Sequence, residues 1–558
     1  MVKKNINMGN QNENISRDVI TYVNGLKTYI VPNGAIRLCL QDIPDRTTIE
    51  YIQMPDSVKE IEKNTFMNCI SLKKIDLSES LKRIGAKAFA YCISLDTIDI
   101  PNTVTDIGYN AFEWCQSLKS IRIPCKVRFI EERSFFGCIS LESIHLPNGL
   151  LRISKSVFEN CYSLKAIHIQ EKEAETDSCI RNGGHDVESN RIPDSVFWID
   201  ESAFANCHSI RSIELPESVN EICKKTFAGC VRLNKVTMSN DLTDIYDQAF
   251  EGCVSLNNIP LSKSLKRMGK GVFKGCISLA GIVIPSNVVE IGENTFEGCE
   301  SLETIELPNG LTRISKSLFY YCRSLKSIHL PDSITEIGEF AFCYCHSLTS
   351  TKMTESNSKI DQYSIEGSHC LEFFVIPRLV SKIGRYAFSD CKALQTIMFQ
   401  GDSNLTEIGS YAFEGCDSLA NIKLPHTTTI IGSCAFFGCH AITTFPMPKS
   451  IMRIGSGAFL GCISLKSIDF PNANSDIKIG RDAFASCISM KYIKLSESVV
   501  SIAKLAFFGC ISLEAIRVPN GSRDFFEQML MNPLDYDDLD DDLDDDLDDD
   551  LDDDLSED

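Results

Sequence analysis

Residues 301–322, SLETIELPNGLTRISKSLFYYC, hold one full period of a pattern that recurs along the chain. The apolar positions of this unit are Leu302, Ile305, Leu307, Leu311, Ile314, Leu318, Phe319 and Cys322. Ile305 and Leu307 alternate with polar residues, as is typical of a short strand. The turn Pro308-Asn309-Gly310 follows. The next two apolar positions begin a second short extended segment, and the Phe and Cys stand three apart, as on one helical turn. One unit cannot bury its apolar side alone, so the pattern predicts stacked units.

Cysteines at the last position of the unit show how often it recurs. They fall 23 residues apart, or 25 at two places. The series is Cys69, Cys92, Cys115, Cys138, Cys161, Cys207, Cys230, Cys253, Cys276, Cys299, Cys322, Cys345, Cys391, Cys416, Cys439, Cys462, Cys487 and Cys510. The gaps from Cys161 to Cys207 and from Cys345 to Cys391 are each 46 residues, twice the period. We therefore expect each gap to hide one degenerate unit, which gives a repeat solenoid of about 20 repeats of 23 residues.

Stacking places equivalent residues of successive units in interior ladders. The phenylalanine and cysteine ladders begin with Phe66, Cys69, Phe89, Cys92, Phe112, Cys115, Phe135 and Cys138. Parallel side chains about 4.8 Å apart fit the geometry of a disulfide poorly. No Cys-x-x-Cys pair with the spacing of a zinc site occurs. We expect buried, reduced thiols that behave as small hydrophobic side chains.

The units resemble the BspA-type leucine-rich repeat, LxxIxLPxxLxxIGxxAFxxC. Good matches are SLKSIRIP (Ser117–Pro124), SITEIGEFAFCYC (Ser333–Cys345) and NLTEIGSYAFEGC (Asn404–Cys416), and the resemblance covers roughly residues 24–521. It implies a right-handed coil with a parallel β-sheet, second short strands and short helical turns. It also implies binding or adhesion, often at the surfaces of microbes and protists, and no catalytic residues.

The repeat register divides the chain into segments. We expect a disordered N-terminal segment (1–23), a solenoid (24–521) that starts with a degenerate cap unit (24–54), a C-terminal capping helix (522–533) and a disordered acidic tail (534–558). Within the solenoid we expect a polar excursion (170–191) and a degenerate unit near 354–376, where Ile365 and Ser368 replace Phe and Cys.

Charge is concentrated at the end of the chain. The formal net charge is −21, and residues 534–558 contribute 17 Asp/Glu and no Lys/Arg. This tail either docks on a basic partner or is an expanded repeat that only adds solubility. The remaining residues have a net charge of only −4, which argues against nucleic-acid binding. No apolar run approaches the ~18 residues of a membrane span, and the first residues lack the apolar core of a secretory signal. We therefore expect a cytoplasmic protein, although the resemblance leaves a cell-surface location open.

Histidines form the only groupings that resemble metal ligands. His145 and His168 occupy equivalent outward positions of adjacent units, as do His346 and His369. Two stacked histidines could hold a metal, but a site needs three or four ligands, so we predict solvated pairs and no metal site. No catalytic constellation stands apart from the repeat, so we expect no enzyme activity and no cofactor.

Outward strand positions are mostly polar, with a few apolar exceptions. Phe373, Val375 and Met398 cluster within two neighbouring units. Exposed apolar groups on a polar sheet mark a contact patch, unless the nearby degenerate repeat covers them. The sequence predicts a non-enzymatic scaffold that binds a protein or peptide ligand on its solenoid face. The alternative is a BspA-type surface adhesin exported without a classical signal peptide.

Overall fold

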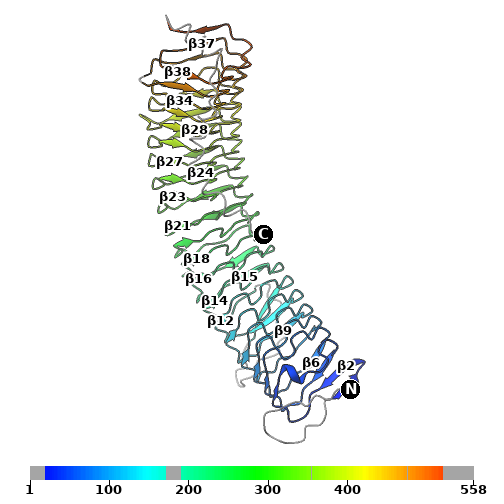
Figure 1. Cartoon of the computed structure of the whole chain (residues 1–558). Helices are drawn as coiled ribbons and strands as arrows, with labels where there is room; N and C mark the ends of the chain where they lie inside the picture. The colour runs from blue at the N-terminus through cyan, green and yellow to red at the C-terminus, as the bar shows by residue number, and fades with distance from the viewer. Residues whose placement is uncertain (1–18, 171–189, 354, 474, 520–558) are drawn as a thin grey trace. The chain divides into compact units, whose positions relative to one another are not determined.

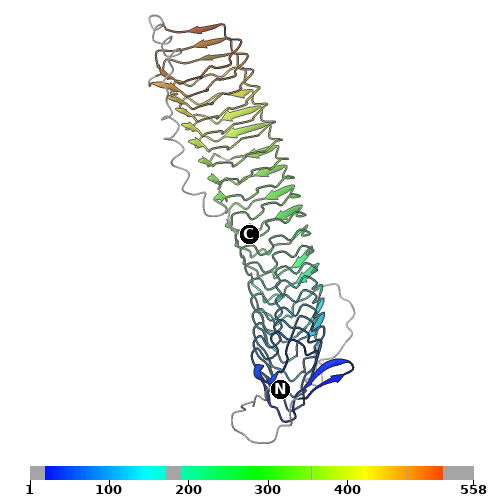
Figure 2. The same cartoon turned by 45° about the vertical axis from the view of Figure 1, so that its right-hand side comes forward.

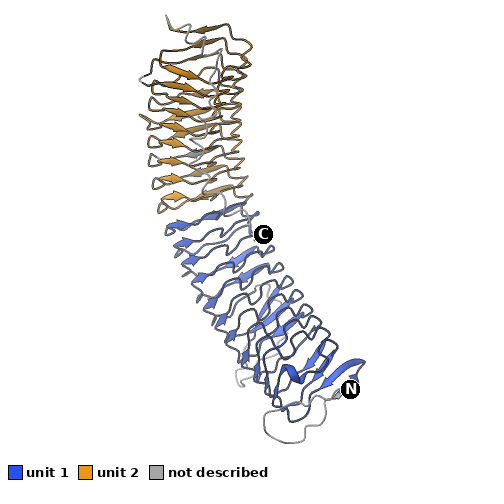
Figure 3. Cartoon of the chain, viewed as in Figure 1, with its two compact units in different colours: residues 1–299 blue, residues 300–558 orange. Residues whose placement is uncertain are grey.

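In the computed structural model of the chain, residues 19–170, 190–353, 355–473 and 475–519 are described. They belong to two compact units, residues 1–299 and residues 300–558, which Figure 3 colours separately. Each unit is a stack of coils, and Figures 1 and 2 show the strands of successive coils lying side by side within it. Together the units contain about 20 turns of the 23-residue repeat, so the predicted β-solenoid is confirmed.

A typical coil supplies one longer strand and one two-residue strand, separated by the Pro-containing turn. In the first unit the longer strands are β2 (Leu26–Ile30), β4 (Tyr51–Gln53), β6 (Lys74–Asp76), β9 (Ser120–Arg122), β11 (Ser143–Pro147), β13 (Ala166–Gln170), β15 (Ser212–Glu214), β17 (Lys235–Thr237) and β20 (Gly281–Val283). The short strands are β3 (Arg37–Leu38), β5 (Glu60–Ile61), β7 (Arg83–Ile84), β8 (Asp106–Ile107), β10 (Phe129–Ile130), β12 (Arg152–Ile153), β14 (Trp198–Ile199), β16 (Glu221–Ile222), β18 (Asp244–Ile245), β19 (Arg267–Met268) and β21 (Glu290–Ile291).

The second unit repeats this arrangement. Its longer strands are β22 (Thr304–Glu306), β24 (Ser327–His329), β26 (Ser350–Lys352), β28 (Phe373–Ile376), β30 (Thr396–Phe399), β32 (Asn421–Ile422), β35 (Ser467–Asp469), β37 (Tyr492–Lys494) and β39 (Ala515–Arg517). Its short strands are β23 (Arg313–Ile314), β25 (Glu336–Ile337), β27 (Lys359–Ile360), β29 (Lys382–Ile383), β31 (Glu407–Ile408), β33 (Ile430–Ile431), β34 (Arg453–Ile454), β36 (Ile477–Ile479) and β38 (Val499–Ile502), and they form one nine-stranded sheet. Neighbouring coils pair in parallel, for example Thr304 with Ser327.

The segment between the short strand and the ladder cysteine differs from the predicted helical turn. Lys87 and Tyr91 have φ of 55° and 63°, in the left-handed region, which a right-handed helix cannot contain. The chain instead makes consecutive turns, and the Phe89 N–H donates to the Ala111 carbonyl of the next coil at 2.8 Å. The only helix among the described residues is a 3-10 turn, η1 (Leu40–Asp42). Hydrogen bonds between coils therefore replace those within a helix.

The phenylalanine ladder forms the core of each unit. Phe66, Phe89, Phe112 and Phe135 are fully buried, and successive ring centroids lie 5.1, 5.2 and 5.4 Å apart with nearly parallel planes. In the second unit the stack from Phe388 to Phe507 is continuous, with centroid distances of 5.0–5.5 Å. Offset stacking of this kind adds to the free energy gained by burying the rings.

The ladder thiols are free and buried, as predicted. Most donate to the carbonyl of the ladder phenylalanine in the preceding coil; Cys115 Sγ, for example, lies 3.2 Å from the Phe89 oxygen, whereas Cys391 donates to the Ile365 carbonyl. Burial raises the pKa of the Cys138 thiol to about 12, and the same cause raises the pKa of Cys115. These thiols therefore remain protonated at neutral pH and serve as core side chains.

Among the described residues the first gap adds no coil to the ladder, in agreement with the predicted polar excursion (170–191) and unlike the degenerate unit that the cysteine spacing alone suggested. Phe158 stacks directly on Phe204 at 5.2 Å, and β12 pairs with β14. β13 ends at Gln170, and the next described residue is Asn190. Both ends of the predicted excursion belong to the solenoid, because Gln170 and Asn190 are only 3% and 7% exposed. Residues 171–189 lie outside the described part of the chain.

The second gap does contain a folded coil. Ile365 and Ser368 are fully buried at the ladder positions, and the Ile365 N–H donates to the Ala387 carbonyl at 2.9 Å. In the same coil Phe374 points inward, and its ring meets the Phe388 ring edge-on at 4.9 Å. Phe374 on the strand thus adds the volume that is lost where Ile365 replaces a ladder phenylalanine, and the core stays filled.

The N-terminal boundary also differs from the prediction. Residues 19–23, which we assigned to a disordered segment, form β1 (Val19–Val23), which pairs antiparallel with β2. The alternation in VITYV is that of a strand, and a left-handed Asn24 followed by Gly25 makes the two-residue turn of a hairpin. Residues 1–18, the expected capping helix (522–533) and the acidic tail (534–558) lie outside the described residues.

Candidate binding surface

The predicted apolar patch lies on the outward face of β28 and β30. Val375 pairs in register with Met398, and Phe373 pairs with Thr396. Alternation along β28 buries Phe374 and Ile376 completely and turns Phe373 and Val375 outward. Phe373 is 49% exposed and Met398 is 48% exposed, while Val375 is half-buried between them. The degenerate coil therefore does not cover this patch (Phe373, Val375 and Met398).

A second exposed apolar group occupies the same sheet face in the first unit. Val283 on β20 is 75% exposed, and Pro260 of the preceding coil is exposed beside it. Together with Ile259 and Leu261 they line a shallow hollow of about 710 Å³. Pro260 and Val283 are thus adjacent in space, as expected for equivalent positions of successive repeats.

The histidine pairs stack as the repeat spacing predicts. The rings of His145 and His168 lie 4.7 Å apart, and those of His346 and His369 also lie 4.7 Å apart, the second pair nearly parallel. Burial, together with the charges of His168 and Arg122, lowers the pKa of His145. Burial also lowers the pKa of His346, with smaller contributions from His369 and Arg323.

Neither pair has the ligand number of a metal site. Within the described ranges, no three His, Cys, Asp or Glu side chains lie close enough together to hold one metal ion. The low pKa of His145 and of His346 favours the neutral rings, and two rings in contact need not share an ion to be stable. The stacked rings are therefore a consequence of the repeat geometry.

Sequence reasoning missed an aromatic column on the turn face of the second unit. Phe340, Tyr363, Tyr386 and Tyr411 stack in succession, with centroids 4.6, 4.9 and 4.6 Å apart. Burial is the main cause that raises the pKa of Tyr411, to about 12. The signal was present in the sequence, because these four residues follow the 23- and 25-residue spacings of the cysteines. We overlooked it because all of our candidates were strand or ladder positions.

Carboxylates lie beside this column. Burial raises the pKa of Glu366, and the charges of Asp390 and Glu414 raise it further. The Cys343 thiol donates to Glu366 Oε2 at 3.2 Å, and burial followed by the charge of Glu366 raises the pKa of this thiol. No basic side chain contributes to the raised pKa of Glu366. Glu366, Asp390 and Glu414 therefore form a partly buried acidic cluster with a structural role.

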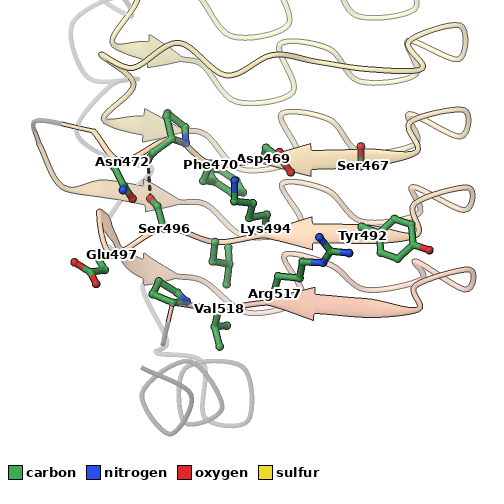
Figure 4. A pocket seen from close by; sticks show the side chains of 13 residues that line it. Ser467, Asp469, Phe470, Asn472, Tyr492, Lys494, Ser496, Glu497, Arg517 and Val518 are labelled. Atoms are coloured by element: carbon green, nitrogen blue, oxygen red, sulfur yellow. Dashed lines mark hydrogen bonds between the residues drawn. The ribbon is translucent and has the colours of Figure 1, made fainter. Parts of the chain in front are cut away.

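A polar hollow of about 660 Å³ lies at the last described coils of the second unit, and Figure 4 shows it. Lys494 and Arg517 line it from β37 and β39, Asp469 lines it from β35 in register with Lys494, and Glu497 lies to one side. The Arg517 guanidinium lies 5.6 Å from the centre of the Tyr492 ring. In the part of the chain that the structure describes, no helix is long and apolar enough to cross a bilayer.

Stacked coils with parallel strands and an inward Leu/Ile pattern define a leucine-rich-repeat solenoid. The sequence profile of the BspA type leucine rich repeat region matches residues 43–165, 176–289, 266–395, 381–514 and 472–534. These matches include most of the chain, so the protein belongs to the BspA-type leucine-rich repeat family. A search of curated proteins gave no significant match.

Solved structures of leucine-rich repeat proteins also match. One from Bacteroides ovatus is 23% identical, covers 78% of this chain and 94% of its own, and has a TM-score of 0.43. The T. pallidum leucine rich repeat protein is 33% identical over 29% of this chain and 77% of its own, with a TM-score of 0.28. A leucine rich cell surface protein from Faecalibacterium prausnitzii is 21% identical, covers 93% of this chain and 96% of its own, and has a TM-score of 0.24.

Proposed function

We propose that the protein is a non-enzymatic scaffold that binds a protein or peptide ligand on the face of its longer strands. The observation that carries this proposal is the patch of Phe373, Val375 and Met398. Each coil presents outward side chains in register with those of its neighbours on a rigid backbone. Repeat proteins build extended binding surfaces in this way. In the patch these positions hold apolar side chains that remain half-exposed, a feature typical of a contact site.

The patch suits a ligand with an apolar anchor. Glu372 and Gln395 lie exposed at its edge, so a polar rim surrounds the apolar centre. Phe373 and Met398 are side-chain types enriched at protein interfaces, and the backbone beneath them is fixed by parallel pairing, of β28 with β30 and of β30 with β32. Little conformational entropy is lost on binding because the surface is preformed.

Substitution within the patch tests the proposal. Val375→Asp and Met398→Asp each place a charge at the centre of the patch while the inward residues stay in place. Thr304→Asp is the matched control, since Thr304 occupies the outward position equivalent to Phe373 on β22. We expect a partner captured by the wild type and by Thr304→Asp to be lost from both patch variants. If every partner remains bound to both variants while their thermal unfolding is unchanged, the patch is not the binding site.

Family membership supports a second proposal, a surface adhesin. It differs from the first in location and in ligand, because an adhesin acts outside the cell. Proteolysis of intact source cells separates the two proposals. Rapid loss of the protein from unbroken cells supports the adhesin, whereas protection until lysis supports an intracellular scaffold.

A further inference from the structure

Positive charge gathers in the last coils of the second unit. Residues 440–519 contain 9 Lys/Arg and 5 Asp/Glu, a net charge of +4, whereas residues 1–439 have a net charge of −7. Lys466, which directly precedes β35, Lys494 of β37 and Arg517 of β39 are all exposed. We call these three residues the basic strip.

Elsewhere on the same sheet face, several lysines pair with a carboxylate of a neighbouring coil. Lys73 pairs with Glu50 at 2.7 Å and Lys326 pairs with Glu303 at 2.6 Å, in each case 23 residues apart. The position equivalent to Lys466 in the following coil is Lys491, which pairs with Glu514 at 3.1 Å. Within the described residues, no carboxylate lies within ion-pair distance of Lys466, Lys494 or Arg517. Several lysines of this face thus have a counterion in a neighbouring coil, whereas the basic strip, like Lys119 and Lys235, forms no ion pair within the described residues.

The chain itself holds a segment of opposite charge close by in sequence. Residues 534–558 contain 17 Asp/Glu and no Lys/Arg, and 16 residues separate Leu534 from Arg517. Fully extended, 25 residues span up to about 80 Å, while successive coils are only about 4.8 Å apart. A tether of this length gives an intramolecular partner an effective concentration near the millimolar range.

We propose that the acidic tail, residues 534–558, docks on the basic strip of its own chain. The hollow shown in Figure 4 would receive aspartates beside Lys494 and Arg517; of its own acids, Glu497 lies to one side, and Asp469 lies on β35 in register with Lys494. Arg517, beside the Tyr492 ring, presents a planar guanidinium suited to a carboxylate. Many weak ion pairs, each exposed, would hold the tail in a salt-sensitive manner.

Zero-length carbodiimide crosslinking of the full chain tests this docking, because it joins only carboxylates and amines in contact. We expect amide links between tail aspartates and Lys494 or Lys466 at low salt. At 1 M NaCl, where the Debye length is only ~3 Å, we expect roughly tenfold fewer. Arg517→Glu leaves both lysine nucleophiles in place and should reduce these links several-fold. Lys235→Glu is the matched control, an equal charge change on the exposed β17 of the first unit, and should leave them unchanged.

Three outcomes would contradict the proposal. Absence of tail links to the strip in the wild type, or equal links in Arg517→Glu and wild type, shows that the tail does not dock there. Crosslinking a mixture of ¹⁴N- and ¹⁵N-labelled protein decides between the chain's own tail and that of a second copy. In an equal mixture, mixed-isotope links that approach half of the total would assign the strip to a second copy and contradict intramolecular docking, which gives almost none. Circular dichroism and the thermal midpoint of both variants confirm that they are folded.

Discussion

The two 46-residue gaps in the cysteine series have the same length but different structures. Between Cys161 and Cys207 the coils join directly, because Phe158 stacks on Phe204 and β12 pairs with β14. Between Cys345 and Cys391 the residues form a complete coil with Ile365 and Ser368 in the ladder positions. A solenoid can therefore absorb one repeat length either as an insertion or as a coil. What decides between them is whether the residues can fill the ladder.

The largest expected effect concerns the stack across the first gap. Since Phe158 meets Phe204 without interruption, Phe204→Ala should cost about 3–5 kcal/mol of unfolding free energy, as should Phe227→Ala within the regular coils. Urea unfolding of the two variants under the same conditions measures both values. A cost for Phe204→Ala less than half that of Phe227→Ala would mean that the core is interrupted at this gap.

The next effect concerns the point where the inserted segment returns. The Ile167 N–H donates to Asn190 Oδ1 at 2.8 Å, and Asn190 Nδ2 donates to the Lys165 and Ser212 carbonyls. Asn190→Ala leaves these buried groups without that partner and should cost about 2–3 kcal/mol. The exposed Asn257 supplies the control, since Asn257→Ala should change stability by less than about 0.5 kcal/mol. Equal urea midpoints for the two variants would show that the amide does not close the sheet.

A smaller effect tests how the second gap fills its core. Ile365→Phe restores the repeat consensus but adds volume beside Phe374, so it should destabilise by about 1–3 kcal/mol. Combining it with Phe374→Ile restores the consensus at both positions and should recover most of the loss. A double-mutant cycle in urea gives the coupling energy. Additive costs would show that Phe374 does not compensate for the small ladder residue.

The smallest expected effect concerns the pH dependence of stability at the two histidine pairs, one of which lies near each gap. The pKa values of His145 and His346 are lowered in the folded protein, so below about pH 6.5 the unfolded chain binds more protons and stability falls. The loss begins near the unfolded-state pKa and is complete once the pH has passed below the lowered folded-state value. His145→Gln and His346→Gln should each flatten the decline in unfolding free energy between pH 7.5 and 5.5. If the unfolding free energies of the variants fall with pH in parallel with the wild type, these two histidines are not the cause of the decline.

The sequence by itself determined the repeat length, the parallel coil and the buried thiols, because these depend on residues within one unit and its immediate neighbours. The same logic placed Phe373, Val375 and Met398 outward, since alternation along a strand is local. Cysteine spacing alone did not tell the two gaps apart, because it counts residues and not turns; the polar composition of residues 170–191 predicted an excursion in the first gap, and the kept register predicted a coil in the second. Only the tertiary structure revealed how Asn190 closes the sheet and how Phe374 offsets Ile365. Those contacts join residues about ten or more positions apart, whose proximity depends on how the coils stack.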